Sequence, residues 1–173
     1  MLLKNPADSA LLNTYVTEAV KGPVRYELLW QGNRDGFGCA TFHGRCNKKG
    51  PTLTVILSNN DKIFGGYTSE PWRSRQDWAQ DTTAFIYSLT NKAKCATQKN
   101  SNSIYDSSSA GPWFGSGHDI IIQDNCNARS DNCCESQASN STYALPPGAD
   151  NNFLAGSRNF TVKEIEVYAV IKI

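Results

Sequence analysis

The chain has 173 residues, 39% of them hydrophobic and 19% charged, which fits one globular domain with its own core and excludes a second domain of ordinary size. Lys and Arg number 17 against 16 Asp and Glu, so net charge gives no reason to expect a nucleic-acid partner or binding to an anionic membrane. Because no run approaches the ~20 apolar residues of a membrane helix and no signal-peptide pattern opens the chain, we expect an intracellular, cytoplasmic protein without membrane insertion.

Residues 1–22 predict an amphipathic helical segment that belongs to the same domain as the rest of the chain. Apolar side chains recur at helical spacing between positions 11 and 19, and this period places them on one face. Asp8 or Ser9 is placed to cap the start of the helix, and Gly22-Pro23 is placed to end it. Residues 23–173 then form the main domain.

Most segments after residue 23 have the pattern of strands. Residues 24–30 and 164–173 alternate between two faces, as expected for strands with one buried side. Runs rich in β-branched or aromatic residues predict further strands at 53–57, 63–68, 84–89 and 120–122.

The segments between these strands predict a second short helix and several loops. The helix is expected within residues 37–46, and polar stretches predict long loops at 70–83, 98–117 and 124–141. Many strands with few helices indicate a mainly β (α+β) fold, in which two packed antiparallel β-sheets form a β-sandwich with short flanking helices.

Several motifs, taken in order, resemble the TLDc family. They are Leu28-Leu29-Trp30 with Arg34-Asp35-Gly36-Phe37, the stretch 46–54, the run 63–68, the glycine-rich segment 111–120, and residues 153–157 leading into 164–168. The resemblance covers nearly the whole chain from the first helix onward, although Trp113 and Ser116 depart from the family pattern in the glycine-rich segment. The resemblance implies a non-catalytic protein-interaction module, with a role in oxidative-stress protection and with the vacuolar-type proton pump (V-type ATPase) or another large assembly as its partner.

The family's glycine motifs have a physical interpretation in this chain. Glycines inside or next to strands suit bulges, turns with positive φ, or close approach of two backbones. No Walker-type lysine follows them, so a phosphate-binding loop is disfavoured. We therefore interpret six motif residues as structural, with the histidine bonded to backbone: Gly65, Gly66, Gly115, Gly117, His118 and Asp119.

The loop that follows residue 70 is the candidate partner-binding segment. It carries Trp72, Arg73, Arg75 and Trp78, and Trp and Arg are the residue types that most often anchor protein interfaces. The alternative is that both tryptophans fold back to cover one end of the sandwich. Glu166 is a further partner candidate, because strand alternation is expected to point it toward solvent.

The six cysteines allow two further hypotheses, although reduced thiols without a special role are the simpler interpretation. Cys126, Cys133 and Cys134 fall in a polar stretch beside Arg129, where a nearby cation could lower a thiol pKa and make the loop redox-sensitive.

Metal binding is the second hypothesis for the cysteines. Cys39, His43 and Cys46 are spaced i, i+4 and i+7, so a helix would place three zinc ligands on one face, with Cys95 as a possible fourth. The same face must also pack against a sheet, so we expect no metal and no cofactor.

Catalysis has little support in this sequence. His43 and His118 are the two histidines, and no strand-turn-helix elbow presents a nucleophile beside either. We therefore expect no enzyme. Two alternatives to the interaction module stay open: a cysteine-dependent redox enzyme or peroxide scavenger, and a fixed structural subunit that would expose a large apolar patch when isolated.

Overall fold

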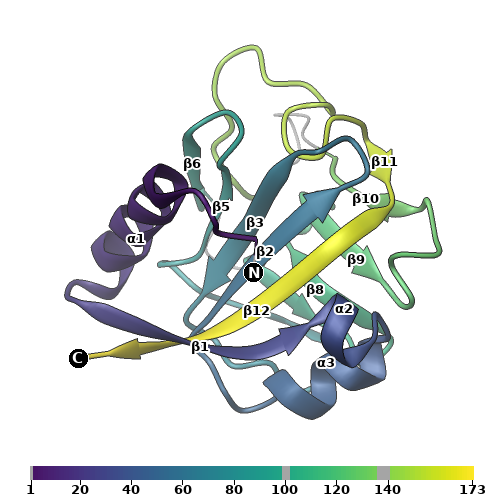
Figure 1. Cartoon of the computed structure of the whole chain (residues 1–173), viewed down its shortest axis with the longest axis horizontal. Coiled ribbons are helices and arrows are strands. Elements are labelled where there is room, and N and C mark those ends of the chain that lie inside the picture. Colours follow the sequence, from purple (N-terminus) through teal and green to yellow (C-terminus); the bar gives the residue numbers. More distant parts are fainter. Residues whose placement is uncertain (1, 99–101, 136–140) are drawn as a thin grey trace.

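The computed structural model describes residues 2–98, 102–135 and 141–173, and these form two antiparallel sheets packed face to face (Figure 1). Part of the predicted 124–141 loop, residues 136–140, lies outside the described residues. The helices are α1 (Pro6–Val20), α2 (Gly32–Asp35) and α3 (Cys39–Cys46). The fold class expected from the sequence is confirmed.

The first sheet, which we call sheet A, contains the longer strands. Its order is β1 (Val24–Gln31), β12 (Val162–Lys172), β2 (Thr52–Ser58), β3 (Ile63–Thr68), β5 (Phe85–Ser88) and β6 (Ala93–Ala96). The last strand of the chain therefore lies between β1 and β2, and every neighbouring pair is antiparallel.

The second sheet, sheet B, is built from shorter strands. Its order is β11 (Asn159–Phe160), β10 (Asn132–Cys133), β9 (Ile120–Gln123), β8 (Ala110–Phe114), β7 (Ile104–Asp106) and β4 (Asp77–Ala79). Five of these strands were not expected, and β4, β7, β8 and β10 lie in stretches predicted as loops. Each of the five has only two to five residues, too few for an alternating pattern to show.

Helix α1 covers the outer face of sheet A. It begins earlier than expected: Asn5 caps it by accepting a hydrogen bond from the Ala7 backbone N–H at 3.0 Å, and Pro6 takes the first helical position. Lys21 ends it in the left-handed conformation, with φ of 55°. Leu12 and Val16 are its buried side chains, and none of the helices in the described ranges is long and apolar enough to cross a membrane.

The core has two parts because sheet A is buried on both faces. Between the sheets, Phe64 and Ile165 of sheet A pack in the same cluster as Phe114 of sheet B. On the outer face of sheet A, Leu12 and Val16 of α1 join a second cluster of side chains from β2, β3, β5 and β12. Every residue of β5 and nearly every residue of β2 is consequently buried. Strands buried on both faces have continuous apolar runs in their sequence, whereas strands with one exposed face alternate between apolar and polar residues.

Two glycines of β3 allow close approach, Gly66 to the opposite sheet and Gly65 to the neighbouring strand β2. A Cβ on Gly66 would lie 2.7 Å from the ring of Phe114, and a Cβ on Gly65 would lie 1.9 Å from the carbonyl oxygen of Thr54. Any larger residue at either position would push apart neighbouring strands or the two sheets.

Candidate partner-binding surface

Three aromatic side chains lie together on the outer face of sheet B. In β7 the side chains of Ile104 and Asp106 are buried while Tyr105 is half-buried, and in β8 Phe114 is buried while Trp113 is half-buried. Trp78 of β4 is half-buried as well. Strand alternation thus sends one aromatic residue from each of three strands away from the core.

These rings form a contiguous group. Trp78 pairs directly with Tyr105 in the sheet register, and their ring centroids lie 4.8 Å apart. Trp113 lies 4.9 Å from Tyr105 and 6.2 Å from Trp78, and both contacts are edge-to-face. His118 extends the group, with its ring 5.7 Å from that of Trp113. We call Trp78, Tyr105, Trp113 and His118 the aromatic surface.

The loop before β4 is organised by one buried carboxylate. Asp106 is fully buried and accepts hydrogen bonds from the backbone N–H groups of Arg73, Ser74 and Arg75 at 2.9 to 3.1 Å. The Arg75 side chain adds a hydrogen bond from its Nε at 3.2 Å. Three converging amides around one carboxylate fix the loop backbone in a single arrangement beside the aromatic surface.

The two arginines of this loop differ in whether their side chains are already paired with acidic residues. Arg75 binds Asp106 and lies 4.0 Å from Glu70, so its guanidinium is already engaged. Arg73 is exposed, and among the described residues no acidic side chain pairs with it. Arg73 therefore keeps an unused cation on the loop that precedes β4.

Two of the predicted partner residues are corrected by the structure. Trp72 is fully buried between Phe42 and Phe114, and its indole N–H donates to Thr52 Oγ1 at 3.0 Å. It covers the sandwich interior, which was the alternative interpretation. Glu166 is also fully buried, because α1 and residues 2–4 cover the face of β12 that alternation assigned to solvent.

The glycine-rich motif forms a turn anchored by a buried acid. Gly115 has φ of 78°, and a Cβ there would lie 1.9 Å from an oxygen of Asp119. Burial raises the pKa of Asp119 to about 6, although hydrogen bonds from Ser141 and from the Thr142 backbone oppose that rise. Gly117 lies in the same turn, but the second left-handed residue is His118, with φ of 61°.

The His118 side chain differs from expectation. Its imidazole is about half exposed and lies 3.8 Å from the Glu135 carboxylate, and among the described residues its ring makes no hydrogen bond to backbone. It belongs to the aromatic surface instead.

The proposed zinc ligands are held in other interactions. His43 is buried, with Nε2 3.0 Å from the Ala110 carbonyl oxygen and Nδ1 3.0 Å from Asn47 Oδ1 and 3.1 Å from Ser74 Oγ. Burial raises the pKa of the Cys46 thiol to about 12, which disfavours the thiolate that zinc needs. Within the described ranges, no three His, Cys, Asp or Glu side chains gather as a metal ion would require.

Burial disfavours the redox hypothesis for two of its three cysteines. Cys126 and Cys134 are fully buried, and burial raises the pKa of both thiols, that of Cys126 to about 12. Cys133 is half-buried, and burial raises its pKa too. Arg129, the cation expected to lower a thiol pKa, pairs with Asp131 instead.

Of the four residues of the aromatic surface, only Trp78 was expected from the sequence to bind a partner, and His118 was expected to be structural. Trp78 was named, whereas Tyr105 lies in a stretch expected to be a loop and Trp113 was seen only as a departure from a family pattern. The available signal was the pair Trp113-Phe114, because adjacent aromatic residues in a strand point to opposite faces and one must face outward.

Comparison with known proteins agrees with the fold. A family model described as the TLDc domain matches residues 3–171. The MTOR-associated protein MEAK7 of Danio rerio is 26% identical over 78 residues, which cover 45% of this chain and 17% of that protein. Interferon-induced protein 44 of Pan troglodytes is 42% identical over 55 residues, covering 32% of this chain and 12% of that protein.

A third match shows the same limited coverage. MEAK7 of Xenopus laevis is 23% identical over 94 residues, which cover 54% of this chain and 20% of that protein. The chain thus corresponds to a fifth or less of the length of each of these relatives.

Proposed function

Since this chain belongs to the TLDc domain family, we propose that it acts as a non-catalytic protein-interaction module whose partner binds the aromatic surface of sheet B. The observation that carries the proposal is the contact of the half-buried rings of Trp78, Tyr105 and Trp113 on the outer face of sheet B. Aromatic residues and arginine dominate the binding energy of protein interfaces, because they desolvate large areas at a small cost in side-chain entropy.

The rigidity of the neighbouring loop supports the same proposal. Asp106 holds the backbone of residues 73–75 in one conformation, so presenting Arg73 to a partner costs little ordering entropy. The rings of the aromatic surface also fix one another by their mutual contacts. Because these groups are already held in place, a partner can bind this surface without a conformational change of the domain.

The partner that the family resemblance implies is the V-type ATPase or another large assembly, in the context of oxidative-stress protection. Two of the relatives are named as MTOR-associated, which suggests MTOR as a second candidate partner. Both partners are proposals for this chain, since it corresponds to a fifth or less of those relatives. The surface chemistry fits a partner that presents an apolar patch edged by acidic side chains facing Arg73.

Binding of the purified chain to purified V-type ATPase, measured by biolayer interferometry, tests this proposal. We expect Trp113→Ala and Trp78→Ala each to weaken binding at least tenfold, because truncating an interface anchor typically costs about 2 kcal/mol. Arg73→Ala should weaken binding by a smaller factor without changing the melting temperature.

Arg25→Ala is the matched control, since Arg25 is equally exposed but lies on β1 of the other sheet. Unchanged affinity in both tryptophan variants would exclude the aromatic surface. Affinity lost equally in the Arg25 variant would indicate nonspecific electrostatic binding.

The other two hypotheses receive less support. Burial raises the pKa of Cys126 and Cys134, which disfavours a thiol-based peroxide scavenger. A fixed structural subunit was expected to show a large exposed apolar patch, but the exposed large hydrophobic residues of the described chain are Tyr26 and Ile173.

A further inference from the structure

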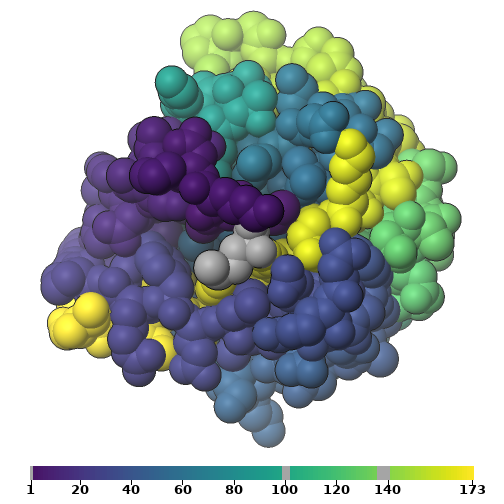
Figure 2. Space-filling model, viewed as in Figure 1, coloured from purple at the N-terminus to yellow at the C-terminus, as the bar shows by residue number. Residues whose placement is uncertain are grey.

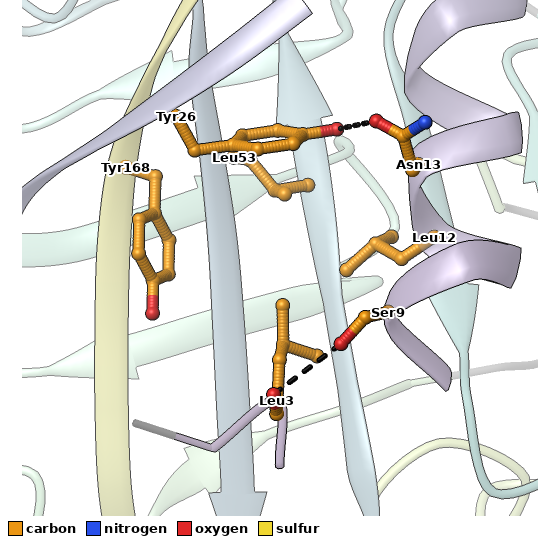
Figure 3. A pocket seen from close by; sticks show the side chains of 7 residues that line it. All are labelled: Leu3, Ser9, Leu12, Asn13, Tyr26, Leu53 and Tyr168. Atoms are coloured by element: carbon orange, nitrogen blue, oxygen red, sulfur yellow. Dashed lines mark hydrogen bonds between the residues drawn. The ribbon is translucent and has the colours of Figure 1, made fainter. Parts of the chain in front are cut away.

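A hollow of about 250 Å³ lies on the outer face of sheet A, beneath α1 (Figure 3). Leu12 of α1 and Leu53 of β2 supply buried aliphatic surface to its lining, and Tyr26 of β1 and Tyr168 of β12 are its aromatic residues. The hollow is on the opposite side of the sandwich from the aromatic surface, so it is a separate feature of the molecule.

The polar groups at the edge of this hollow are already hydrogen-bonded. Tyr26 donates its hydroxyl to Asn13 Oδ1 at 3.1 Å, and Tyr168 donates to Glu166 Oε2 at 2.6 Å. The hydroxyl of Ser9 donates to the Leu3 carbonyl at 3.3 Å. The walls therefore offer apolar contact, which suits an aliphatic or aromatic side chain rather than a polar group.

A buried carboxylate lies beside the hollow and binds backbone. Both oxygens of Glu166 lie 2.9 Å from the backbone nitrogen of Leu2. The side-chain amide of Gln31 donates to Glu166 at 3.3 Å and to Glu164 at 3.1 Å, while Tyr168 donates from the other side. Glu166 is thus held in place as an acceptor for a backbone N–H.

The chain's own N-terminal segment contacts both features. Leu2 places its N–H on Glu166, and the next residue, Leu3, lines the hollow. Figure 2 shows this segment, in dark purple, running across the face of the molecule toward the yellow residues of β12. Leu2 and Leu3 are only half-buried, and the hollow is still present with Leu3 at its edge.

We propose that this face is a peptide-binding groove, whose edge residues 2–4 cover in cis and which takes a partner peptide of the same chemistry in trans. The partner peptide donates a backbone N–H to Glu166 and places the following apolar side chain in the hollow. Because the hollow remains open beside Leu3, a larger side chain such as Phe fits it better than Leu does.

Competition from the chain itself sets the strength of binding. A tethered segment acts at an effective concentration in the millimolar range, so an added peptide must displace residues 2–4 before it binds. Weakening the cis contact should therefore strengthen binding in trans. A surface that binds peptides nonspecifically would not bind an added peptide more strongly when the cis contact is weakened, so this effect distinguishes the two cases.

The test uses the full chain and a fluorescein-labelled peptide with the sequence of residues 2–5, capped at its N-terminus by an acyl group, in fluorescence polarisation. Leu3→Ala in the protein should raise affinity for this peptide at least fivefold over the unaltered chain. A peptide with Phe in place of its second Leu should bind more tightly, and one with Ala there should bind at least tenfold more weakly.

Two further variants assign the contacts. In the Leu3→Ala background, Glu166→Gln should weaken peptide binding severalfold, and Trp113→Ala should leave it unchanged. If Glu166→Gln impairs folding, Tyr168→Phe removes one hydrogen bond to the carboxylate and should weaken binding less. Equal affinity for the Leu and Ala peptides, or no binding to the Leu3→Ala chain at millimolar peptide, would overturn the proposal.

Discussion

The two sheets of this sandwich use their outer faces in opposite ways. Helix α1 and residues 2–4 cover part of the outer face of sheet A, so β2 and β5 are buried on both faces. The outer face of sheet B displays the half-buried rings of Trp78, Tyr105 and Trp113. One face contributes mainly to stability, while the other leaves large aromatic groups available to a partner.

The comparison shows why residue type alone did not identify the interface. Trp72 and Trp78 lie in one short segment of the sequence, yet Trp72 fills the core and Trp78 lies on the outer face. Glu166 has the residue type of a surface charge and is fully buried. Whether a side chain is buried or available to a partner depends on which face of each sheet the other elements cover.

Replacing the two tryptophans separately should give the largest difference. We expect Trp72→Ala to lower the free energy of unfolding by about 3–5 kcal/mol, because it empties a buried aromatic site and leaves Thr52 without its indole donor. Trp78→Ala should cost about 1 kcal/mol, since its ring is already partly in water. Urea unfolding measures both, and similar losses would contradict the contrast between core and surface.

Weakening the packing of α1 on sheet A should cause the next largest loss of unfolding free energy. Leu12→Ala removes a buried side chain that packs between α1 and the sheet, so we expect a loss of about 2–3 kcal/mol in unfolding free energy. Hydrogen exchange should speed up first in α1. Thr14→Ala is the control, because Thr14 is exposed on the same helix; an equal loss there would mean that α1 does not depend on its buried face.

The Asp119 turn at the edge of sheet B should make stability depend on pH. Burial raises its pKa from 3.8 to about 6, so the folded state favours the protonated acid. Its stabilising contribution is present below about pH 4 and is lost as the pH rises through about 6, a change on the order of 3 kcal/mol. Asp119→Asn cannot ionise and should lose this part of the pH dependence.

Unfolding in denaturant at pH 4.5, 5.5 and 7 measures the difference between the two proteins. The difference in unfolding free energy between the unaltered protein and the Asp119→Asn variant should change with pH. Relative to the unaltered protein, the variant should be more stable at pH 7 than at pH 4.5. A constant gap would show that Asp119 keeps an ordinary pKa in the folded protein.

The smallest expected effect concerns the thiols. Cys39 and Cys133 are half-buried, whereas the other four cysteines are buried. We expect a thiol reagent to label these two in the native protein with almost no change in melting temperature, and to label the rest only after unfolding. Mass spectrometry of labelled peptides measures this, and early labelling of Cys126 or Cys134 would reopen the redox hypothesis.

The fold was largely predictable because its longest elements carry strong periodic signals. The alternation in 24–30 and 164–173 and the apolar runs at 53–57 and 63–68 each correspond to a strand of sheet A. The helix expected within 37–46 is α3, although the four-residue α2 before it was not foreseen. These elements are long enough for period and propensity to outweigh local variation.

Sheet B and the candidate surface were much less predictable. Strands such as β7 and β10 have two or three residues, too few for a period to show. Trp78 meets Tyr105 only through a pairing between distant segments, which one sequence does not reveal. The burial of Glu166 depends on the N-terminal segment crossing over β12, a tertiary contact with no local signal.

The strand order of sheet A also sets a constraint on synthesis. Residues 162–172 lie between β1 and β2, so two strands made early must wait for one made near the end before either gains that neighbour. A nascent chain that has emerged only as far as residue 160 therefore holds two unpaired strand edges, and chaperones that recognise extended apolar segments would have their longest opportunity to act on it then.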